Sequence, residues 1–398
     1  MSGMANRRKI LISAGETSGD IYAAALIDEL LKCGDFEIHA VGGTQTARRP
    51  VTMLYDSQNW AAIGYIEAIK QAPKLLLVLR NLKNLLGTMR PDLLILLDYP
   101  GFNMRLAREA TRLGIPSLYV FPPSKFATNP ADVADAARNI TAVAANFSFT
   151  HEVYKAAGAN VEFVGHPLID LARPSMERED AFRCFGLDPA RPVIGLCPGS
   201  RRSELEQLLP LMLDTARLLL KDDPTLQFAV PVIATEGPDV YGFPKADLRR
   251  QIEEAQLPVR IVEGRIYDVM SISKLLLISS GTATLEATRI GTPMVIVYRV
   301  SLFTEIVARL FNKLPEFIGL PNIILGRMAI PELIQHDFTA EQLAGRAREL
   351  LNDPALRERQ KRDMAEAIAH LGTSGACGRI AQMALRLLKA AASADGAK

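Results

Sequence analysis

The sequence predicts two α/β domains in tandem, each a doubly wound parallel sheet with helices on both faces. Uninterrupted apolar segments alternate with helical patterns along the 398 residues, and such segments are typical of parallel strands that are covered on both sides. A chain of this length exceeds one ordinary core. The alternation stops at a polar stretch, residues 173–191, and then starts again. We therefore expect residues 1–170 to form the first domain and residues 171–398 the second.

The first domain is expected to open with a buried strand at residues 9–14. This strand ends at Gly15, and a helical pattern follows over residues 21–32. Glycine and proline after an apolar run mark the turns at which a strand ends. Further strands are expected at residues 36–41, 93–97, 116–121, 140–147 and 161–164, with a helix that opens at Thr150.

The second domain repeats this pattern. A strand is expected at residues 192–197 and a helix at 203–220, followed by strands at 227–233, 259–262, 275–278 and 294–298. Two doubly wound domains in tandem would face a central cleft at the carboxyl ends of their strands. Residues 374–391 form an amphipathic helix, which either caps the second domain or, as we expect, packs back on the first.

Composition limits the classes of function. A formal net charge of +2 argues against a nucleic-acid-binding protein, which usually carries a strongly basic domain. The four cysteines lie far apart in the sequence, so they form no metal-ligand pair. Their spacing indicates no disulfide framework, which favours a cytoplasmic protein whose thiols are reduced. No stretch approaches about 20 uncharged apolar residues. We expect a cytoplasmic protein that is soluble or lies on the inner face of the cytoplasmic membrane.

Residues 66–90 interleave leucines with lysines and arginines. Such a stretch can lie on an anionic membrane surface. A buried helix with solvated basic flanks explains the pattern equally well. Residues 303–311, with Arg309 and nearby Lys313, offer a second apolar and basic patch.

The turn at residues 199–203, Gly-Ser-Arg-Arg-Ser, follows a predicted strand and opens a predicted helix. Amides at a helix start attract anions, and glycine lets the backbone approach a phosphate closely. Arg201 and Arg202 add guanidinium donors suited to phosphate. Ser203 with Glu206 also fits a capping box, so a capped helix with two surface arginines is the alternative.

A second turn, residues 279–286, joins a strand to a helix through small and hydroxyl residues. The amides of Gly281 and Thr282 can hold a pyrophosphate, and Glu286 can accept hydrogen bonds from a ribose diol. The alternative is an ordinary strand–helix turn. Two anion-binding helix starts in one domain favour a nucleotide site.

Two acidic features mark the first domain. The turn at residues 15–20, Gly-Glu-Thr-Ser-Gly-Asp, lacks the spacing of a phosphate-binding loop. Its two carboxylates would repel a phosphate, so we expect this turn to contact sugar hydroxyls. The alternative role of Asp20 is that of an N-cap. Asp98 follows an apolar strand and precedes Tyr99-Pro100-Gly101. Partial desolvation there would raise its pKa towards that of a working base, although Asp-x-Pro-Gly is also turn-like.

The ordered set of motifs resembles the lipid-A-disaccharide synthase family from about residue 9 to 385. The set comprises residues 15–20, 41–43, 163–170, 198–204, 280–286, 291–294, 320–322 and 331–333. The resemblance implies two Rossmann-like domains of the GT-B type. It also implies an inverting, metal-independent glycosyltransferase that needs no cofactor, and this sequence has no Asp-x-Asp metal motif. The implied reaction joins UDP-2,3-diacylglucosamine to 2,3-diacylglucosamine 1-phosphate and yields a β-1,6 disaccharide phosphate and UDP.

The resemblance also assigns roles to matching positions. Asp98 would be the general base for the acceptor 6-hydroxyl, while Glu16, a second catalytic candidate, and Ser18 would face the acceptor or the reacting sugar. Arg201 would hold the donor diphosphate and Glu286 the ribose. The full set implied to bind the donor is Gly199, Ser200, Arg201, Arg202, Ser280, Gly281, Thr282, Glu286 and Asn322.

One segment departs from the family. After Phe121 the family usually shows a Trp-Ala-Trp element, whereas residues 122–128 here carry no tryptophan, and Trp60 stands alone in the chain. A related transferase with a different acceptor therefore stays open, as do a UDP-sugar epimerase and a non-catalytic UDP-sugar binder. The expected partners are the two acylated sugar substrates and the cytoplasmic membrane surface, with no nucleic acid; a homodimer is one open assembly.

Overall fold

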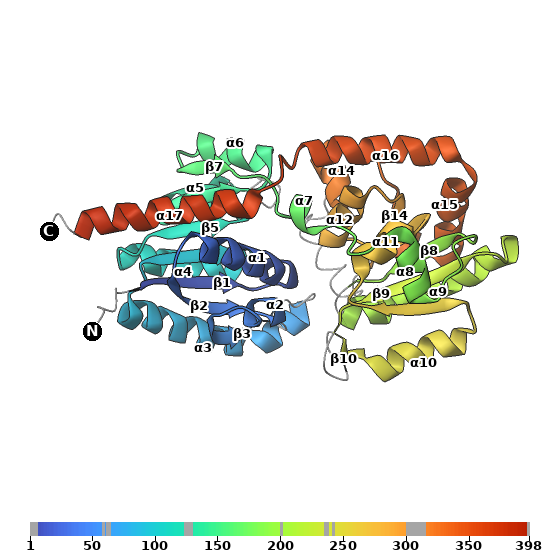
Figure 1. The fold of residues 1–398 in the computed structure, drawn as a ribbon, viewed down its shortest axis with the longest axis horizontal. Helices are drawn as coiled ribbons and strands as arrows, with labels where there is room; N and C mark the ends of the chain where they lie inside the picture. Colours follow the sequence, from blue (N-terminus) through green and yellow to red (C-terminus); the bar gives the residue numbers. More distant parts are fainter. Residues whose placement is uncertain are drawn as a thin grey trace. The chain divides into compact units, whose positions relative to one another are not determined.

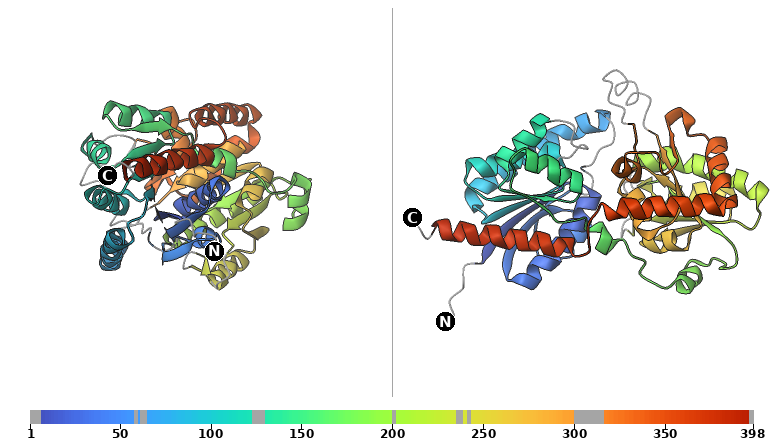
Figure 2. Two further views of the ribbon diagram at one scale, coloured as in Figure 1. Left: turned by 60° about the vertical axis from the view of Figure 1, so that its left-hand side comes forward. Right: turned by 90° about the horizontal axis from the view of Figure 1, so that it is seen from above.

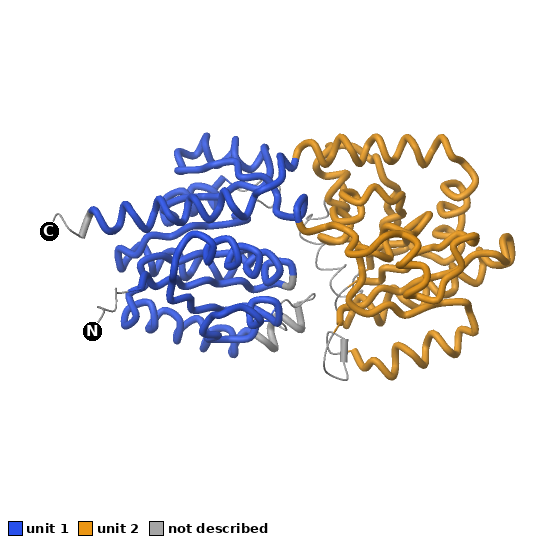
Figure 3. Tube along the Cα trace, viewed as in Figure 1, with its two compact units in different colours: residues 1–170, 371–398 blue, residues 171–370 orange. Residues whose placement is uncertain are grey.

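The computed structural model describes residues 7–57, 60, 65–122, 130–199, 202–234, 239–240, 243–299 and 316–395. The chain divides into two compact units (Figure 3). Unit 1 comprises residues 1–170 and 371–398, and unit 2 comprises residues 171–370. Each unit has its own parallel sheet (Figures 1 and 2), which confirms the predicted fold class.

Unit 1 is built on a seven-stranded sheet of order β3-β2-β1-β4-β5-β6-β7, in which every neighbouring pair is parallel. The chain moves outward from β1 in one direction and then, from β4, in the other. The direction therefore reverses between β1 and β4. The strands are β1 (Arg8–Ala14), β2 (Phe36–Gly42), β3 (Thr52–Asp56), β4 (Leu93–Leu97), β5 (Ser117–Val120), β6 (Ala142–Ala145) and β7 (Val161–Phe163).

Helices alternate with these strands. They are α1 (Thr17–Cys33), α2 (Thr44–Ala47), α3 (Tyr65–Met89), α4 (Pro100–Arg112), α5 (Pro130–Asn139), α6 (Ser148–Ala156) and α7 (Leu168–Leu171), which reaches the unit boundary. All five residues of β4 are fully buried, as expected of a central strand that is apolar on both sides. The sequence did not predict β3, an edge strand whose residues are partly exposed.

Unit 2 has a six-stranded parallel sheet of order β12-β9-β8-β13-β14-β15. Its direction reverses between β8 and β13. The strands are β8 (Val193–Cys197), β9 (Gln227–Val232), β12 (Val259–Glu263), β13 (Leu275–Ser279), β14 (Met294–Tyr298) and β15 (Glu332–Ile334), and β10 (Asp239–Val240) and β11 (Phe243–Pro244) form a small antiparallel pair. The sequence did not predict β15 either, because three residues are too few to show the alternating apolar pattern of a strand.

The helices of unit 2 cover both faces of this sheet. They are α8 (Arg178–Phe185), α9 (Arg202–Asp222), α10 (Lys245–Ala255), α11 (Ile266–Ile272), α12 (Thr282–Ile290), α14 (Leu320–Leu325), α15 (Ala340–Asn352) and α16 (Pro354–Ala369). One apolar cluster joins α9 and α15 to one face, and another joins α12 to the opposite face. None of the helices formed by described residues is long and apolar enough to cross a bilayer.

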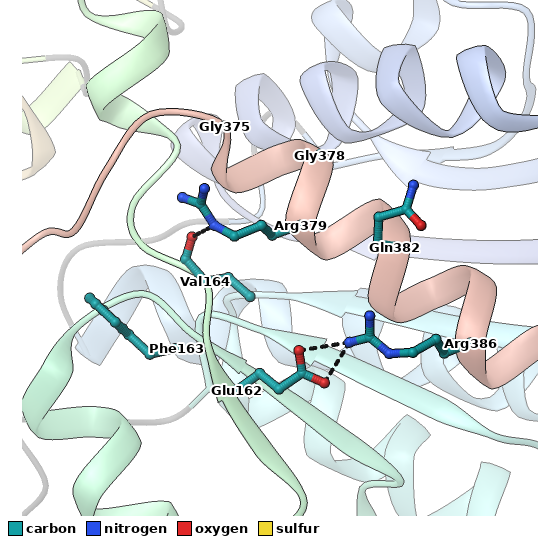
Figure 4. A pocket seen from close by; sticks show the side chains of 8 residues that line it. All are labelled: Glu162, Phe163, Val164, Gly375, Gly378, Arg379, Gln382 and Arg386. Atoms are coloured by element: carbon teal, nitrogen blue, oxygen red, sulfur yellow. Dashed lines mark hydrogen bonds and ion pairs between the residues drawn. The ribbon is translucent and has the colours of Figure 1, made fainter.

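The C-terminal helix α17 (Ala376–Asp395) belongs to unit 1 and packs on α1. The expected domain range had placed residues 371–398 in the second domain, whereas the expected packing of this helix on the first domain agrees with the structure. Its buried side chains include Ile380 and Ala384. Arg386 pairs with Glu162, and Arg379 donates to the Val164 carbonyl at 2.8 Å (Figure 4). A pocket of about 400 Å³ lies between α17 and β7.

Candidate active site

The sequence-predicted motifs lie where each sheet reverses direction. In unit 1, the turn that follows β1 and the turn that follows β4 are neighbours, because Ala14 pairs with Leu97. In unit 2, the turns after β8 and β13 are neighbours, because Cys197 pairs with Ile278. Doubly wound sheets bind their ligands at such reversal points, outside the carboxyl ends of the strands. Each unit therefore has its own candidate binding region.

In unit 1, the turn after β1 packs directly on Asp98 and Tyr99. A Cβ atom built on Gly15 would lie 2.4 Å from Cδ1 of Tyr99, and one on Gly19 would lie 3.9 Å from Cβ of Asp98. Only a residue without a side chain fits at Gly15. Glu16 and Ser18, which lie between these two glycines, are partly exposed. The structure thus brings the turn that carries Glu16 and Ser18 against Asp98, and the Glu16 charge acts on the Asp98 carboxyl.

The backbone at Asp98 has an unusual conformation. Asp98 has φ 53° and Tyr99 has φ 49°, so two consecutive residues with side chains adopt the left-handed conformation. This conformation costs an L-residue roughly 1–2 kcal/mol. Strain of this kind persists where the surrounding structure enforces it, and it is concentrated at functional sites. Tyr99 packs against Trp60 and Phe102, and its hydroxyl donates to the Trp60 carbonyl at 3.3 Å.

The Asp98 carboxyl has the electrostatics of a base that works near neutral pH. Burial, followed by the negative charge of Glu16, raises the pKa of Asp98 from 3.8 to about 7. Burial and the Glu16 charge also raise the pKa of Tyr99. A carboxyl group with this pKa can hold or release a proton at physiological pH.

Two other polar residues of unit 1 have structural roles. The Asp20 carboxylate accepts hydrogen bonds from the amides of Gly43, Gln45 and Thr46 at 2.8–2.9 Å. It therefore caps the start of the neighbouring helix α2 rather than its own helix. The His166 ring is buried among Tyr22, Phe121 and Phe147, and burial lowers the pKa of His166 to about 3, so this ring is neutral.

The turn after β8 begins at Gly199, which has φ +113°. A Cβ atom there would also meet the carboxylate of Glu204, a buried residue that folds back over the turn. Arg202 is the first residue of α9, and its Nε donates to Glu206 at 2.7 Å. The predicted Ser203 cap is wrong, because Ser203 is the second residue inside this helix. Ser200 and Arg201 lie outside the described residues.

The turn after β13 has an open face. Gly281 is exposed and has no atom within 4 Å of the position of an added Cβ. Thr282, the first residue of α12, is partly exposed. The Ser280 hydroxyl donates to the Ile318 carbonyl at 2.7 Å, so this side chain is engaged within unit 2. The amides of Gly281 and Thr282 at the start of α12 suit an anion.

Glu286 lies one turn further along α12 and faces the end of β8. Burial raises the pKa of Glu286 from 4.5 to about 7, and the Tyr267 hydroxyl, 3.3 Å from its Oε1, partly opposes this shift. Burial and then the charge of Glu286 raise the pKa of the Cys197 thiol to about 12. The Glu286 charge therefore acts on Cys197, the last residue of β8. A carboxylate here can accept hydrogen bonds from a diol.

Asn322 is fully buried, and its amide is fully used inside unit 2. Nδ2 donates to the Ile330 carbonyl and to Glu332 Oε1, each at 2.7 Å, while Oδ1 accepts from the amides of Ala329 and Ile330. A direct contact with a substrate would require one of these bonds to break. Glu332 also accepts from the amides of Ile318 and Gly319, so it fixes the segment that contacts Ser280.

Sequence reasoning missed the residues that support these groups. Asn103 and Tyr119 hold the Asp98 turn, Tyr267 contacts Glu286, and Glu332 orders residues 318–322. The available signals were weak: a lone polar residue in a helix or a strand. Residues 123–128, part of the segment that departs from the family, and residues 303–311 lie outside the described residues. Among the residues that the structure describes, no three His, Cys, Asp or Glu side chains form a metal-binding group.

Solved structures with this fold include enzymes that act on nucleotide sugars. A UDP-GlcNAc 2-epimerase from Neisseria meningitidis bound to UDP-GlcNAc aligns with a TM-score of 0.63 at 14% identity and covers 96% of this chain and 99% of its own. MurG of Acinetobacter baumannii aligns with a TM-score of 0.54 at 15% identity and covers 94% and 99%. At these identities the likeness establishes the fold, two Rossmann-like units of the GT-B type, and nothing about substrate.

Sequence relatives are more specific. The lipid-A-disaccharide synthase of Geobacter sulfurreducens is 37% identical over 383 residues and covers 96% of this chain and 97% of the relative. Lipid-A-disaccharide synthase 1 of Legionella pneumophila is 34% identical over 373 residues, with 93% and 94% covered. The sequence model of the family described as "Lipid-A-disaccharide synthetase" matches residues 10–387. This chain therefore belongs to the lipid-A-disaccharide synthetase family.

Proposed function

We propose that this chain transfers the sugar of UDP-2,3-diacylglucosamine to the 6-hydroxyl of 2,3-diacylglucosamine 1-phosphate and releases UDP. Family membership over residues 10–387 supports the reaction. The observation that carries the mechanism is Asp98, a carboxyl group with a pKa raised to about 7 at the point where the unit 1 sheet reverses. A single base is what an inverting transfer requires.

In this mechanism Asp98 takes the proton of the acceptor hydroxyl while the hydroxyl oxygen attacks the anomeric carbon. The bond from that carbon to the diphosphate breaks, and UDP carries away the electron pair. Glu16 and Ser18, beside Asp98, would contact the acceptor or the reacting sugar. Burial, and after it the negative charge of Glu16, keeps the pKa of Asp98 high, and this would be the contribution of Glu16 to catalysis.

Unit 2 would hold the donor. The amides at the starts of α9 and α12 would stabilise charge on the departing diphosphate, because free helix-start amides and glycine turns bind phosphate. Arg201, with Ser200 and Arg202, would add donors at the α9 start, and Ser280, Gly281 and Thr282 form the α12 start. Glu286 would accept hydrogen bonds from the ribose. Asn322 would act indirectly, through its hydrogen bond to Glu332, which holds the segment beside Ser280.

One assay separates this reaction from the alternatives. Purified protein is incubated with both diacylated substrates, and mass spectrometry follows disaccharide phosphate and UDP. The proposal expects both products in equal amounts and only when the acceptor is present. Epimerisation of the donor without acceptor would identify an epimerase. UDP binding without any product would identify a binding protein, and turnover with a different acceptor only would identify a related transferase.

Membrane contact is a further part of this proposal. Leu76 and Leu77 on α3 are 53% and 59% exposed, and the exposed residues Lys74 and Arg80 flank them. An apolar pair between basic side chains suits an anionic bilayer surface, where acylated substrates would reside. Co-sedimentation with anionic vesicles but not with neutral vesicles is expected, and Leu76→Ser with Leu77→Ser should weaken it. Equal recovery on both vesicle types would contradict the proposed surface.

A homodimer is the assembly that we propose for testing. Sedimentation of the purified protein would then give about twice the 43.6 kDa of one chain. A species with the mass of one chain at the concentrations used for turnover would contradict it.

A further inference from the structure

The Asp98 carboxylate receives no hydrogen bond from any described residue, whereas its main chain is held firmly. The amide of Asp98 donates to the Val120 carbonyl at 3.2 Å. Its carbonyl oxygen accepts two side-chain hydrogen bonds, from the Tyr119 hydroxyl at 2.7 Å and from Asn103 Nδ2 at 2.8 Å. The side chain is therefore directed through the backbone, which leaves the carboxylate oxygens free for a substrate.

These two donors replace a sheet partner. The ladder between β4 and β5 ends at Leu97 and Val120. The carbonyl of Asp98, the residue that follows β4, therefore has no ladder partner in β5. Both Tyr119 and Asn103 are fully buried. A buried hydroxyl or carboxamide is costly unless it is hydrogen-bonded. The bonds to Asp98 satisfy both donors and both acceptor positions of this carbonyl at once.

Asn103 also connects the two strands at the point where the sheet reverses. Its Nδ2 lies 3.0 Å from the Leu97 carbonyl and 3.3 Å from the Ser13 carbonyl, and its Oδ1 accepts from the Ser13 hydroxyl at 2.8 Å. A shift of β1 relative to β4 would break this set of bonds. The position of the Asp98 turn is thereby coupled to the turn that carries Glu16 and Ser18.

We propose that the Tyr119 hydroxyl and the Asn103 carboxamide are positioning residues, which hold the left-handed Asp98–Tyr99 backbone so that the Asp98 carboxylate points at the acceptor. The inference rests on the proposed function, in which Asp98 is the base. Without these donors the strained turn relaxes, and the carboxylate moves away from the attacking hydroxyl. A displacement of about 1 Å in a reacting group can reduce turnover by about 100-fold.

The test compares Tyr119→Phe and Asn103→Leu with a matched control, Tyr154→Phe. Tyr119→Phe keeps the ring and removes only the hydroxyl, so it is expected to fold even if the asparagine variant does not. Tyr154 is a fully buried tyrosine on α6 in the same apolar cluster, and its substitution measures the cost of losing a buried phenol oxygen. The readouts are kcat and KM for both substrates, UDP affinity, melting temperature and the titration of Asp98.

The titration needs no substrate. It is followed by ¹³C NMR of the carboxyl region, with Asp98→Asn to assign the signal. The ionisable groups around this carboxyl are Glu16, Tyr99 and Tyr119. The proposal expects Tyr119→Phe to lower kcat by about 10- to 100-fold with KM and UDP affinity within twofold of wild type, and to move the Asp98 titration from near 7 towards the ordinary range. Tyr154→Phe should lower only the melting temperature.

Two outcomes would overturn the positioning role. One is a Tyr119→Phe protein with wild-type kcat and an unchanged Asp98 titration, whatever its melting temperature. The other is an equal effect of Tyr154→Phe on kcat. If wild-type protein makes no disaccharide while Tyr119→Phe still shifts the Asp98 titration, the proposed function fails and the positioning of Asp98 stands.

Discussion

Replacing Gly15 by alanine should disable the site through one methyl group. The added Cβ would lie 2.4, 2.5 and 2.7 Å from Cδ1, Cγ and Cβ of Tyr99, whereas carbon atoms in contact are about 3.5–4.0 Å apart. Tyr99 or the turn must therefore move by about 1 Å. Overpacking of this size costs about 1–3 kcal/mol of stability. Because Asp98 precedes Tyr99, the same movement should lower turnover by about 100-fold.

The assay measures the free energy of unfolding by urea denaturation, kcat for disaccharide formation and UDP affinity. UDP affinity should stay at the wild-type value, because the proposed nucleotide site lies in unit 2. Gly345→Ala is the matched control, since an added Cβ in the middle of α15 meets no atom within 4 Å. It should leave turnover unchanged and raise stability by up to about 1 kcal/mol. Wild-type turnover and stability in Gly15→Ala would show that the contact between Gly15 and Tyr99 does not position Asp98.

Four further predictions concern the charged groups and the second glycine turn. UDP should bind up to about tenfold more tightly at pH 8 than at pH 6, because Glu286, with a pKa of about 7, accepts ribose hydrogen bonds best when ionised; calorimetry on Glu286→Gln should show a flat profile. Arg201→Ala should weaken UDP binding by about 1.5–3 kcal/mol, and unchanged calorimetric affinity would remove it from the phosphate site. Gly199→Ala should lower the free energy of unfolding by about 1–2 kcal/mol and impair UDP binding, since φ is +113° and Glu204 fills the space for a Cβ. Asp98→Asn should be more stable than wild type at pH 8 but not at pH 3. The pKa of Asp98 is about 7 in the native state and 3.8 in the unfolded state, so ionisation of Asp98 destabilises the fold progressively as the pH rises between those values. The loss is less than about 4 kcal/mol, because the residue is partly exposed.

The central strands could be predicted because burial on both faces leaves a clear signal. The strand limits expected at residues 93–97 and 294–298 match β4 and β14. The edge strand β3 has only exposed and partly exposed positions, so it lacks the continuous apolar pattern of a central strand. The assignment of residues 371–398 to unit 1 depends on long-range packing of α17 on α1, which periodicity does not encode.

The candidate site shows the same division. Glycine turns after apolar strands located both sheet reversals, because turn chemistry is local. The support for each group was not local: Tyr119 reaches Asp98 across 21 positions, and Tyr267 reaches Glu286 across 19. The raised pKa values of Asp98 and Glu286 follow from burial, which the sequence indicated for Asp98 through its place at the end of an apolar strand. The family resemblance implied Asn322 as a donor-site residue, and its hydrogen bonds within unit 2 could not be read from the sequence.

The pH dependence of the single-turnover rate tests most directly whether Asp98 is the base of the transfer. Wild-type protein and Asp98→Asn are compared from pH 5 to 9 with both substrates saturating. The wild-type rate is expected to rise through an apparent pKa near 7. The variant rate should be lower by about 10²–10⁴-fold and should lack that rise, while UDP affinity persists. A variant that turns over as fast as wild type, with the same rise in rate, would contradict the role of Asp98 as the base.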